Sequence, residues 1–237
     1  MPQIEVDEPH AKPPRLPAFR SGSPWTGPLD PDRGLAELVG VSVDAGVHPI
    51  DEGDLARCSE LMVEDSTLRG IGLGVEGGPQ LEIRGSELVS CDLSQARVSV
   101  LQRSRLEGCK LAGTDLSAAS LTDVEFARCT LRYTNLRMAR LRRVRFVECT
   151  LLDVDGFQLE LSDVSVDGCR LTGVNVDRLV AERVDLRGAA ELGLSGVGRL
   201  DGCLVDDHQL PALAPLLALA VGLDLPLDPD PGVDSDR

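Results

Sequence analysis

Hydrophobic residues recur at every fifth position through the middle of the chain. From residue 107 the sequence divides into fives, EGCKL AGTDL SAASL TDVEF ARCTL RYTNL, whose fifth residue is almost always Leu, Phe or Val and whose third is small or aliphatic. This spacing fits neither the helical period of about 3.6 residues nor the strand period of about two. The pattern therefore indicates a repeated structural unit.

A second period, of twenty residues, lies on top of the first and indicates that four units of five complete one coil. Backbone layers of stacked strands lie about 4.8 Å apart, so residues twenty positions apart become neighbours in the stack. We expect the repeated apolar residues to point inward and form the core of about seven coils. These core residues are Cys109, Cys129, Cys149, Cys169, Leu111, Leu131, Leu151, Leu171, Phe126 and Phe146.

The units CDLSQ, TDLSA and TNLRM resemble the pentapeptide repeat family, whose consensus is A(D/N)LXX. The resemblance covers about residues 56–188. It implies an all-β fold, a right-handed quadrilateral parallel β-helix in which the central Leu or Phe and the small residue two positions before it point inward.

The regular frame has three interruptions. Two residues are missing between Val98 and Ser104, and the segment GVEGGP at 74–79 breaks the pattern, so we expect irregular corners at both places. Gly156 stands where a large central residue is expected, which predicts a thin wall at that point.

Charge and proline content divide the chain into regions. The formal net charge is −15, yet residues 55–198 hold 21 acids against 18 bases, and no proline lies between Gln80 and Leu210. A stretch without proline suits a continuous sheet, because proline cannot donate a ladder hydrogen bond. We expect a Pro-rich, acidic N-terminal extension (1–54), a repeat β-helix (55–198), a C-terminal helix region (199–223) and an acidic disordered tail (224–237). The apolar segment 35–47 is expected to cover the first coil.

A short helix of about residues 208–221 is expected after two aspartates, with Pro215 bending or splitting it. Its apolar stripe consists of Leu210, Leu213, Leu217 and Val221. The helix either caps the open end of the solenoid or joins two copies, and one helix could do both. The second role follows from the family resemblance, because some family members dimerise through C-terminal segments. The chain is therefore expected to be either a monomer or a homodimer formed through this helix.

Outward charges alternate between coils, as in the column Asp123, Arg143, Asp163 and Arg183. Residues 127–146 contain seven arginines and no acid, whereas residues 147–166 contain five acids and no base. Pairing between coils explains most of these charges. The alternative is a basic band that grips an acidic partner, with candidate binding residues Arg132, Arg137, Arg142 and Arg143.

Catalytic chemistry is not expected. The three histidines, His10, His48 and His208, lie outside the repeats, so the coils offer no base for a nucleophilic Ser or Cys. Four of the seven cysteines are spaced by twenty and point inward, where a thiol behaves as a small hydrophobic group, so neither a metal site nor a cofactor is expected.

These observations predict a non-enzymatic, rigid scaffold for a protein partner of unknown identity. The acidic balance argues against direct nucleic-acid binding, and the sequence contains no transmembrane run and no signal peptide, so we expect a cytoplasmic protein. The family resemblance implies an alternative, a DNA mimic that binds a type II topoisomerase, DNA gyrase, and modulates it or protects it from quinolones. That alternative requires a continuous acidic stripe along the rod.

Overall fold

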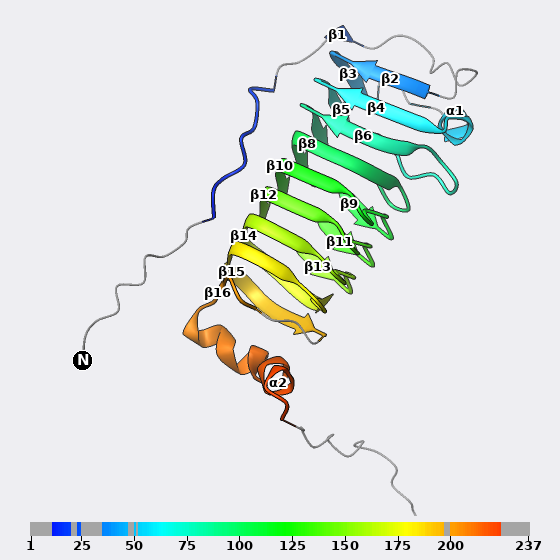
Figure 1. Ribbon diagram of the computed structural model, residues 1–237. Helices are drawn as coiled ribbons and strands as arrows, with labels where there is room; N and C mark the ends of the chain where they lie inside the picture. Colours follow the sequence, from blue (N-terminus) through cyan, green and yellow to red (C-terminus); the bar gives the residue numbers. More distant parts are fainter. Residues whose placement is uncertain are drawn as a thin grey trace, which may run out of the picture.

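The computed structural model describes residues 11–19, 23–24, 35–46, 50, 52–196 and 200–223 (Figure 1). Parallel strands stack into a β-solenoid of about seven turns, with a short helix at its C-terminal end. The predicted fold class is therefore confirmed. None of the helices in the described ranges is long and apolar enough to cross a membrane.

Each coil has four sides, which we number along the chain. In residues 120–139, side 1 is 120–122, side 2 is 124–127, side 3 is 130–132, and side 4 is centred on Asn135, a single bridge residue. The four corners between them, Asp123, Arg128, Tyr133 and Met138, all have left-handed backbone with φ between 52° and 58°. A left-handed residue at every fifth position turns the chain, and this corner is the physical origin of the five-residue period.

Most of the strands lie on sides 1 to 3. Side 1 begins with β2 (Leu35–Val39), β4 (Glu60–Glu64) and β6 (Gln80–Arg84), and side 2 with β1 (Ser23–Pro24), β3 (Val41–Asp44), β5 (Thr67–Arg69) and β7 (Glu87–Val89). Five longer strands turn the corner between these sides: β8 (Arg97–Glu107), β10 (Ser120–Ala127), β12 (Arg140–Val147), β14 (Glu160–Asn175) and β15 (Val180–Ser195). Side 3 carries β9 (Lys110–Ala112), β11 (Thr130–Arg132) and β13 (Thr150–Leu152), and β16 (Cys203–Leu204) pairs with β15.

The stack begins earlier in the chain than residue 55. Strand β2 pairs in parallel with β4, and β3 pairs with β5, so segment 35–44 extends the solenoid as a further layer. A helix that the sequence pattern did not predict, α1 (Glu52–Arg57), connects this layer to the next (Figure 1). Residues 1–10 and the expected tail, 224–237, lie outside the described residues.

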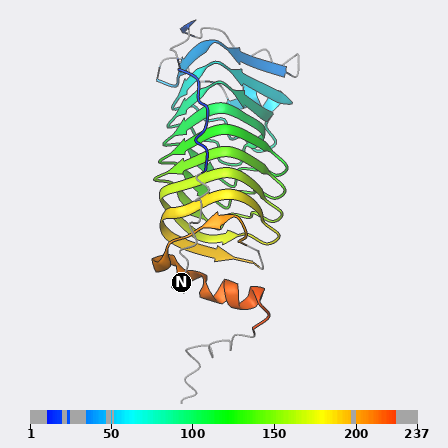
Figure 2. The same ribbon diagram turned by 60° about the vertical axis from the view of Figure 1, so that its left-hand side comes forward.

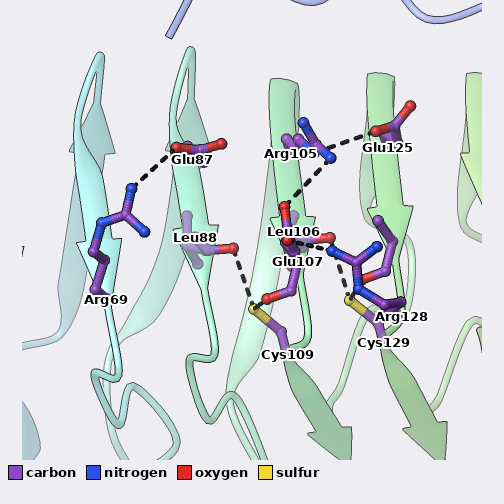
Figure 3. Close-up of polar contacts among 11 residues, drawn as sticks. Arg69, Glu87, Leu88, Arg105, Leu106, Glu107, Cys109, Glu125, Arg128 and Cys129 are labelled. Carbon is purple, nitrogen blue, oxygen red and sulfur yellow. Dashed lines mark hydrogen bonds and ion pairs between the residues drawn. The ribbon is translucent and has the colours of Figure 1, made fainter. Parts of the chain in front are cut away.

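Residues twenty positions apart are paired through the regular coils, and their apolar side chains are buried. Leu121 pairs with Leu141, and the rings of Phe126 and Phe146 stack with centroids 5.0 Å apart and planes 6° apart. The four cysteines and four leucines of the predicted core are also buried. Thiols of the cysteine column donate to carbonyl oxygens, as in Cys129 Sγ to Leu106 O at 3.3 Å (Figure 3).

The repeat is two residues shorter than the regular frame near Val98, and the strand pairing there contains a bulge. Leu81 pairs with Val98 and Glu82 with Val100, so Ser99 is left out of the pairing between β6 and β8. The expectation for Gly156 was wrong, because a Cβ added there would lie 2.6 Å from the Asn175 carbonyl oxygen. The wall is tight at this point, and the main chain of the next coil occupies the space that a side chain would need.

The C-terminal region closes the last coil. A 3-10 turn (Asp207–Gln209) leads into α2 (Leu210–Ala220), which Pro215 does not split. Gln209 is buried, and its Nε2 donates to the carbonyl oxygens of Leu186 at 2.9 Å and Ala189 at 3.2 Å. A side-chain amide therefore satisfies carbonyl groups at the open end of the solenoid.

The buried side of α2 differs from the predicted stripe. Leu213 and Leu216 are buried, whereas Leu210, Leu217 and Val221 are exposed, Val221 to 73%. Of the predicted stripe only Leu213 faces the solenoid, because the helix is positioned by Gln209, which the apolar pattern did not include. Figure 1 shows α2 lying across the end of the stack.

Candidate interaction surface

Arg143 serves the structure of the rod, in contrast to the predicted binding role. Its Nε and Nη2 donate to the two carboxylate oxygens of Asp123, both at 2.6 Å, and its side chain is only 13% exposed. Burial works against the charged carboxylate, but the hydrogen bonds from Arg143 and from the Arg15 amide hold the pKa of Asp123 below its ordinary value. Arg143 is therefore committed to pairing between coils.

The other three predicted arginines lie on three different sides. Arg142 is exposed on side 1, between Thr122 and Ser162, and contacts no acidic side chain among the described residues. Arg132 is exposed at the end of side 3, and Arg137 lies on side 4. The four arginines do not converge on one site.

Side 4 is built on a column of alternating aspartate and asparagine. Asn135 Nδ2 donates to Asp115 Oδ1 at 2.9 Å, and Asn175 Nδ2 donates to Asp155 Oδ1 at 3.1 Å. Each of these carboxylates and amides also accepts the amide N–H two positions later in its own turn, as Asp155 does from Phe157. The alternation keeps like charges apart and holds side 4 rigid.

Phe157 stands at an outward position on side 4, between two guanidinium groups. The Arg137 guanidinium lies 4.5 Å from the ring centroid and that of Arg178 lies 5.4 Å away, both within cation–π range. Arg137 also donates to Asp155 Oδ2 at 2.8 Å. Although burial opposes it, this bond keeps the pKa of Asp155 below its ordinary value.

Two exposed side chains occupy the corners that flank side 4. Tyr133 is 57% exposed with the Arg132 guanidinium 5.0 Å from its ring centroid, and Met138 at the other corner is 48% exposed. Together these residues form a surface that we call the side-4 patch: Arg132, Tyr133, Arg137, Met138, Phe157 and Arg178.

The sequence pattern identified Arg132 and Arg137 of this patch and missed the other four residues. Three of the four could have been noticed from the composition. The chain has one tyrosine, three methionines and four phenylalanines, and Tyr133, Met138 and Phe157 all stand at outward positions of the repeat. A large apolar residue at an outward position is the feature that marks the patch.

Pairing between coils organises the remaining charges. Arg105 lies 3.3 Å from both Glu107 and Glu125, and Arg128 pairs with Glu107 of the preceding coil (Figure 3). The pairing of Arg140 with Glu160 agrees with the twenty-residue spacing. Glu148 lies twenty positions after Arg128, yet Arg128 pairs in the opposite direction, with Glu107.

Arginines of residues 127–146 interrupt all four sides of the rod. Side 1 carries Arg140 and Arg142, side 2 carries Arg145, side 3 carries Arg132 and side 4 carries Arg137. No side therefore presents an uninterrupted acidic stripe across this coil.

Within the described ranges, no group of three or more His, Cys, Asp or Glu side chains is arranged to hold a metal ion. Burial raises the pKa of the Cys203 thiol to about 11.

Comparison with known proteins gives the following findings. Residues 99–176 match the family model described as pentapeptide repeat region, and no curated protein matches. Among solved structures, full-length QnrB1, a plasmid-mediated fluoroquinolone resistance protein, is 17% identical, covering 80% of this chain and 100% of that chain with a TM-score of 0.31. HetL, a pentapeptide repeat protein involved in heterocyst differentiation regulation from the cyanobacterium Nostoc sp. strain PCC 7120, is 16% identical, covering 72% and 90% with a TM-score of 0.19. The family match falls on the coils that carry the five-residue period and the left-handed corners, so residues 99–176 form a pentapeptide repeat region.

Proposed function

We propose that the protein is a non-enzymatic scaffold that docks a protein partner through the side-4 patch. The observation that carries this proposal is the exposure of Tyr133 and Met138 beside arginines on a rigid side of the rod. Tyr, Met and Arg are enriched in the cores of protein interfaces, where a few such residues supply most of the binding energy. A rigid solenoid holds these side chains in place before binding, so little conformational entropy is lost when a partner docks.

The chemistry of the patch describes its partner. The guanidinium groups of Arg132, Arg137 and Arg178 all lie over aromatic rings, and that of Arg137 is also paired with Asp155. The partner surface that fits is apolar at its centre, with acidic groups at its edge.

The test uses two matched double variants of the full chain. Tyr133→Ala with Met138→Ala removes two side chains that are 57% and 48% exposed, and Val39→Ala with Leu219→Ala removes two that are 51% and 49% exposed at the ends of the rod. Ala118 occupies the same corner as Met138 one coil earlier with φ 54°, so alanine is tolerated there.

Affinity capture with quantitative mass spectrometry compares the three proteins. The captured amount of a true partner should be the same for the wild type and the Val39/Leu219 variant. It should be at least tenfold lower for the Tyr133/Met138 variant, which corresponds to a loss of about 1.4 kcal/mol of binding energy. Equal capture by all three baits would overturn the proposal.

The DNA-mimic alternative finds less support. It needs a continuous acidic stripe, and arginines interrupt each side of residues 127–146. A supercoiling assay with DNA gyrase, with and without quinolone, tests it directly using the full chain and a variant truncated after Asp206. We expect no effect on supercoiling at micromolar protein. Inhibition of supercoiling, or protection of the enzyme from quinolone, that is lost on truncation would favour the DNA mimic over the scaffold.

The exposed side of α2 is consistent with a homodimer as a second role of the helix. Leu217→Ser with Val221→Ser leaves Gln209 and Leu213 in place, so light scattering on this variant separates dimer loss from loss of the cap. We also propose a cytoplasmic location, because a buried column of thiols suits a reducing compartment.

A further inference from the structure

Residues 11–19 lie against the outside of the rod, and their C-terminal end reaches a groove beside Gly40, between β2 and β3. Figure 2 shows this segment, in blue, crossing successive coils along the length of the stack. The Arg15 amide donates to Asp123 Oδ1 at 2.9 Å, and the Lys12 amide donates to Asp163 Oδ1 at 3.4 Å. Two main-chain groups three residues apart therefore contact carboxylates two coils apart.

The two spacings match because of the conformation that prolines favour. Polyproline II rises about 3.1 Å per residue, so three residues span about 9.3 Å. Two coils of the stack span about 9.6 Å. The segment has the sequence AKPPRLPAF, and Ala11, Pro14 and Pro17 are half-buried while Lys12, Arg15 and Ala18 are exposed. A burial period of three is that of a polyproline II helix with one side against the rod.

The rod supplies acceptors at the same period. The corner column between sides 1 and 2 alternates Asp123, Arg143, Asp163 and Arg183, so a carboxylate recurs at every second coil. Asp123 and Asp163 are 6% and 4% exposed, and each is held by two bonds from the arginine of the next coil. The acceptor oxygens are thus fixed in place before a segment binds.

Further along, the segment passes a place where the column has no side chain. Gly85 stands in this column, and with Asp65 it borders a groove of about 350 Å³ that Pro17, Ala18 and Phe19 also line. At the other end a groove of about 590 Å³ lies beside Ala11 and Pro13, and its wall holds Asp206 and the ion pairs Arg145–Asp167 and Arg187–Asp185. The hydrogen bonds from Arg183 lower the pKa of Asp163, and those from Arg143 lower the pKa of Asp123 against the effect of burial; the positive charges of Lys12 and Arg15 act in the same direction.

We propose that this corner column is a docking groove for basic, proline-rich segments in the polyproline II conformation, and that residues 11–19 are its resident, intramolecular occupant. Proline-rich ligands suit such a groove because their conformation is already ordered before binding. The resident segment closes the groove to other proline-rich segments, since tethering gives it an effective concentration in the millimolar range. This surface lies on a different part of the rod from the side-4 patch.

The test changes one N–H group in the full chain. Arg15→Pro removes the amide donor and suits polyproline II, whereas Arg15→Ala removes the same charge and keeps the donor. The probe is a fluorescently labelled synthetic peptide of residues 9–20, PHAKPPRLPAFR, whose binding is followed by anisotropy. We expect at least tenfold tighter peptide binding to the Arg15→Pro protein than to the wild type or to Arg15→Ala.

A second peptide tests the match of spacings. Inserting one alanine between Pro13 and Pro14 moves the two donor amides to a spacing of four residues, and its binding to the Arg15→Pro protein should fall at least tenfold. Equal binding of both peptides, or no binding of the first at millimolar concentration, would overturn the groove. Equal affinity of the first peptide for wild type and Arg15→Pro, or a concentration-dependent dimer that Arg15→Pro abolishes, would overturn the intramolecular occupant.

Discussion

Replacing Phe126 by alanine tests how the coils are held together. Phe126 is fully buried, its ring stacks on Phe146 at 5.0 Å, and it pairs with Leu106 in the coil before. Large-to-small changes of this kind cost about 3–5 kcal/mol, because the transfer energy is lost and a cavity remains. Loss of the stacked ring pair adds to the cost, so we expect a decrease of about 4 kcal/mol in the free energy of unfolding.

Urea denaturation followed by far-ultraviolet circular dichroism measures this decrease. Each coil contacts only its neighbours, so a weak interface at Phe126 is also expected to split the transition into two steps. The control Phe126→Leu should cost less than about 1.5 kcal/mol, since a leucine already occupies the same column at position 106. An Arg142→Ala control on the exterior should leave stability unchanged. A free energy of unfolding for Phe126→Ala within about 0.5 kcal/mol of the wild type would refute the stacked core.

Three further predictions concern the charge column, the cavity and the cap. The pKa values of Asp123 and Asp163 are lowered in the folded chain, so the stability they contribute is complete above the unfolded value of about 3.9 and is lost as pH falls through the folded values; acid titration of the unfolding midpoint should show this loss, and Asp163→Asn should reduce it. An apolar cavity of about 70 Å³ borders Val166, so Val166→Leu should raise stability by about 1 kcal/mol in the same denaturation assay, and a decrease would mean that the cavity cannot accept a methylene. Gln209→Ala leaves the carbonyl oxygens of Leu186 and Ala189 unsatisfied and should cost about 1–3 kcal/mol, with faster hydrogen exchange confined to the last coil; uniform exchange along the rod would contradict a local cap.

Periodic features of the chain were predictable, because they repeat the same physical demand in every coil. The buried column of Leu111 and its equivalents, the stacked phenylalanines and the alternation of Asp123 with Arg143 all follow from one spacing. The fold class required no more than this spacing and the family resemblance.

Features that occur once were not predictable in the same way. Gln209 acts through a side-chain amide at one end of the stack, and Gly156 is constrained by the main chain of the next coil. The docking of Lys12 and Arg15 depends on their backbone amides, which no side-chain pattern records. Tyr133 and Phe157 were visible only as apolar residues at outward positions, and their partners became clear only when neighbouring coils were stacked.

The contact between residues 11–19 and every second coil bears on how such a rod can change over evolutionary time. Repeat arrays lengthen or shorten by duplication or loss of whole coils, and a solenoid core accepts either parity. Here the loss of residues 127–146 would bring Asp123 and Asp163 one coil apart, while the amides of Lys12 and Arg15 would still be three residues apart. Gain of two coils between these aspartates preserves the correspondence if the segment also gains three residues, one turn of polyproline II, whereas gain or loss of a single coil breaks it. The number of residues between the two amides of the N-terminal segment is thus tied to the number of coils between the two aspartates.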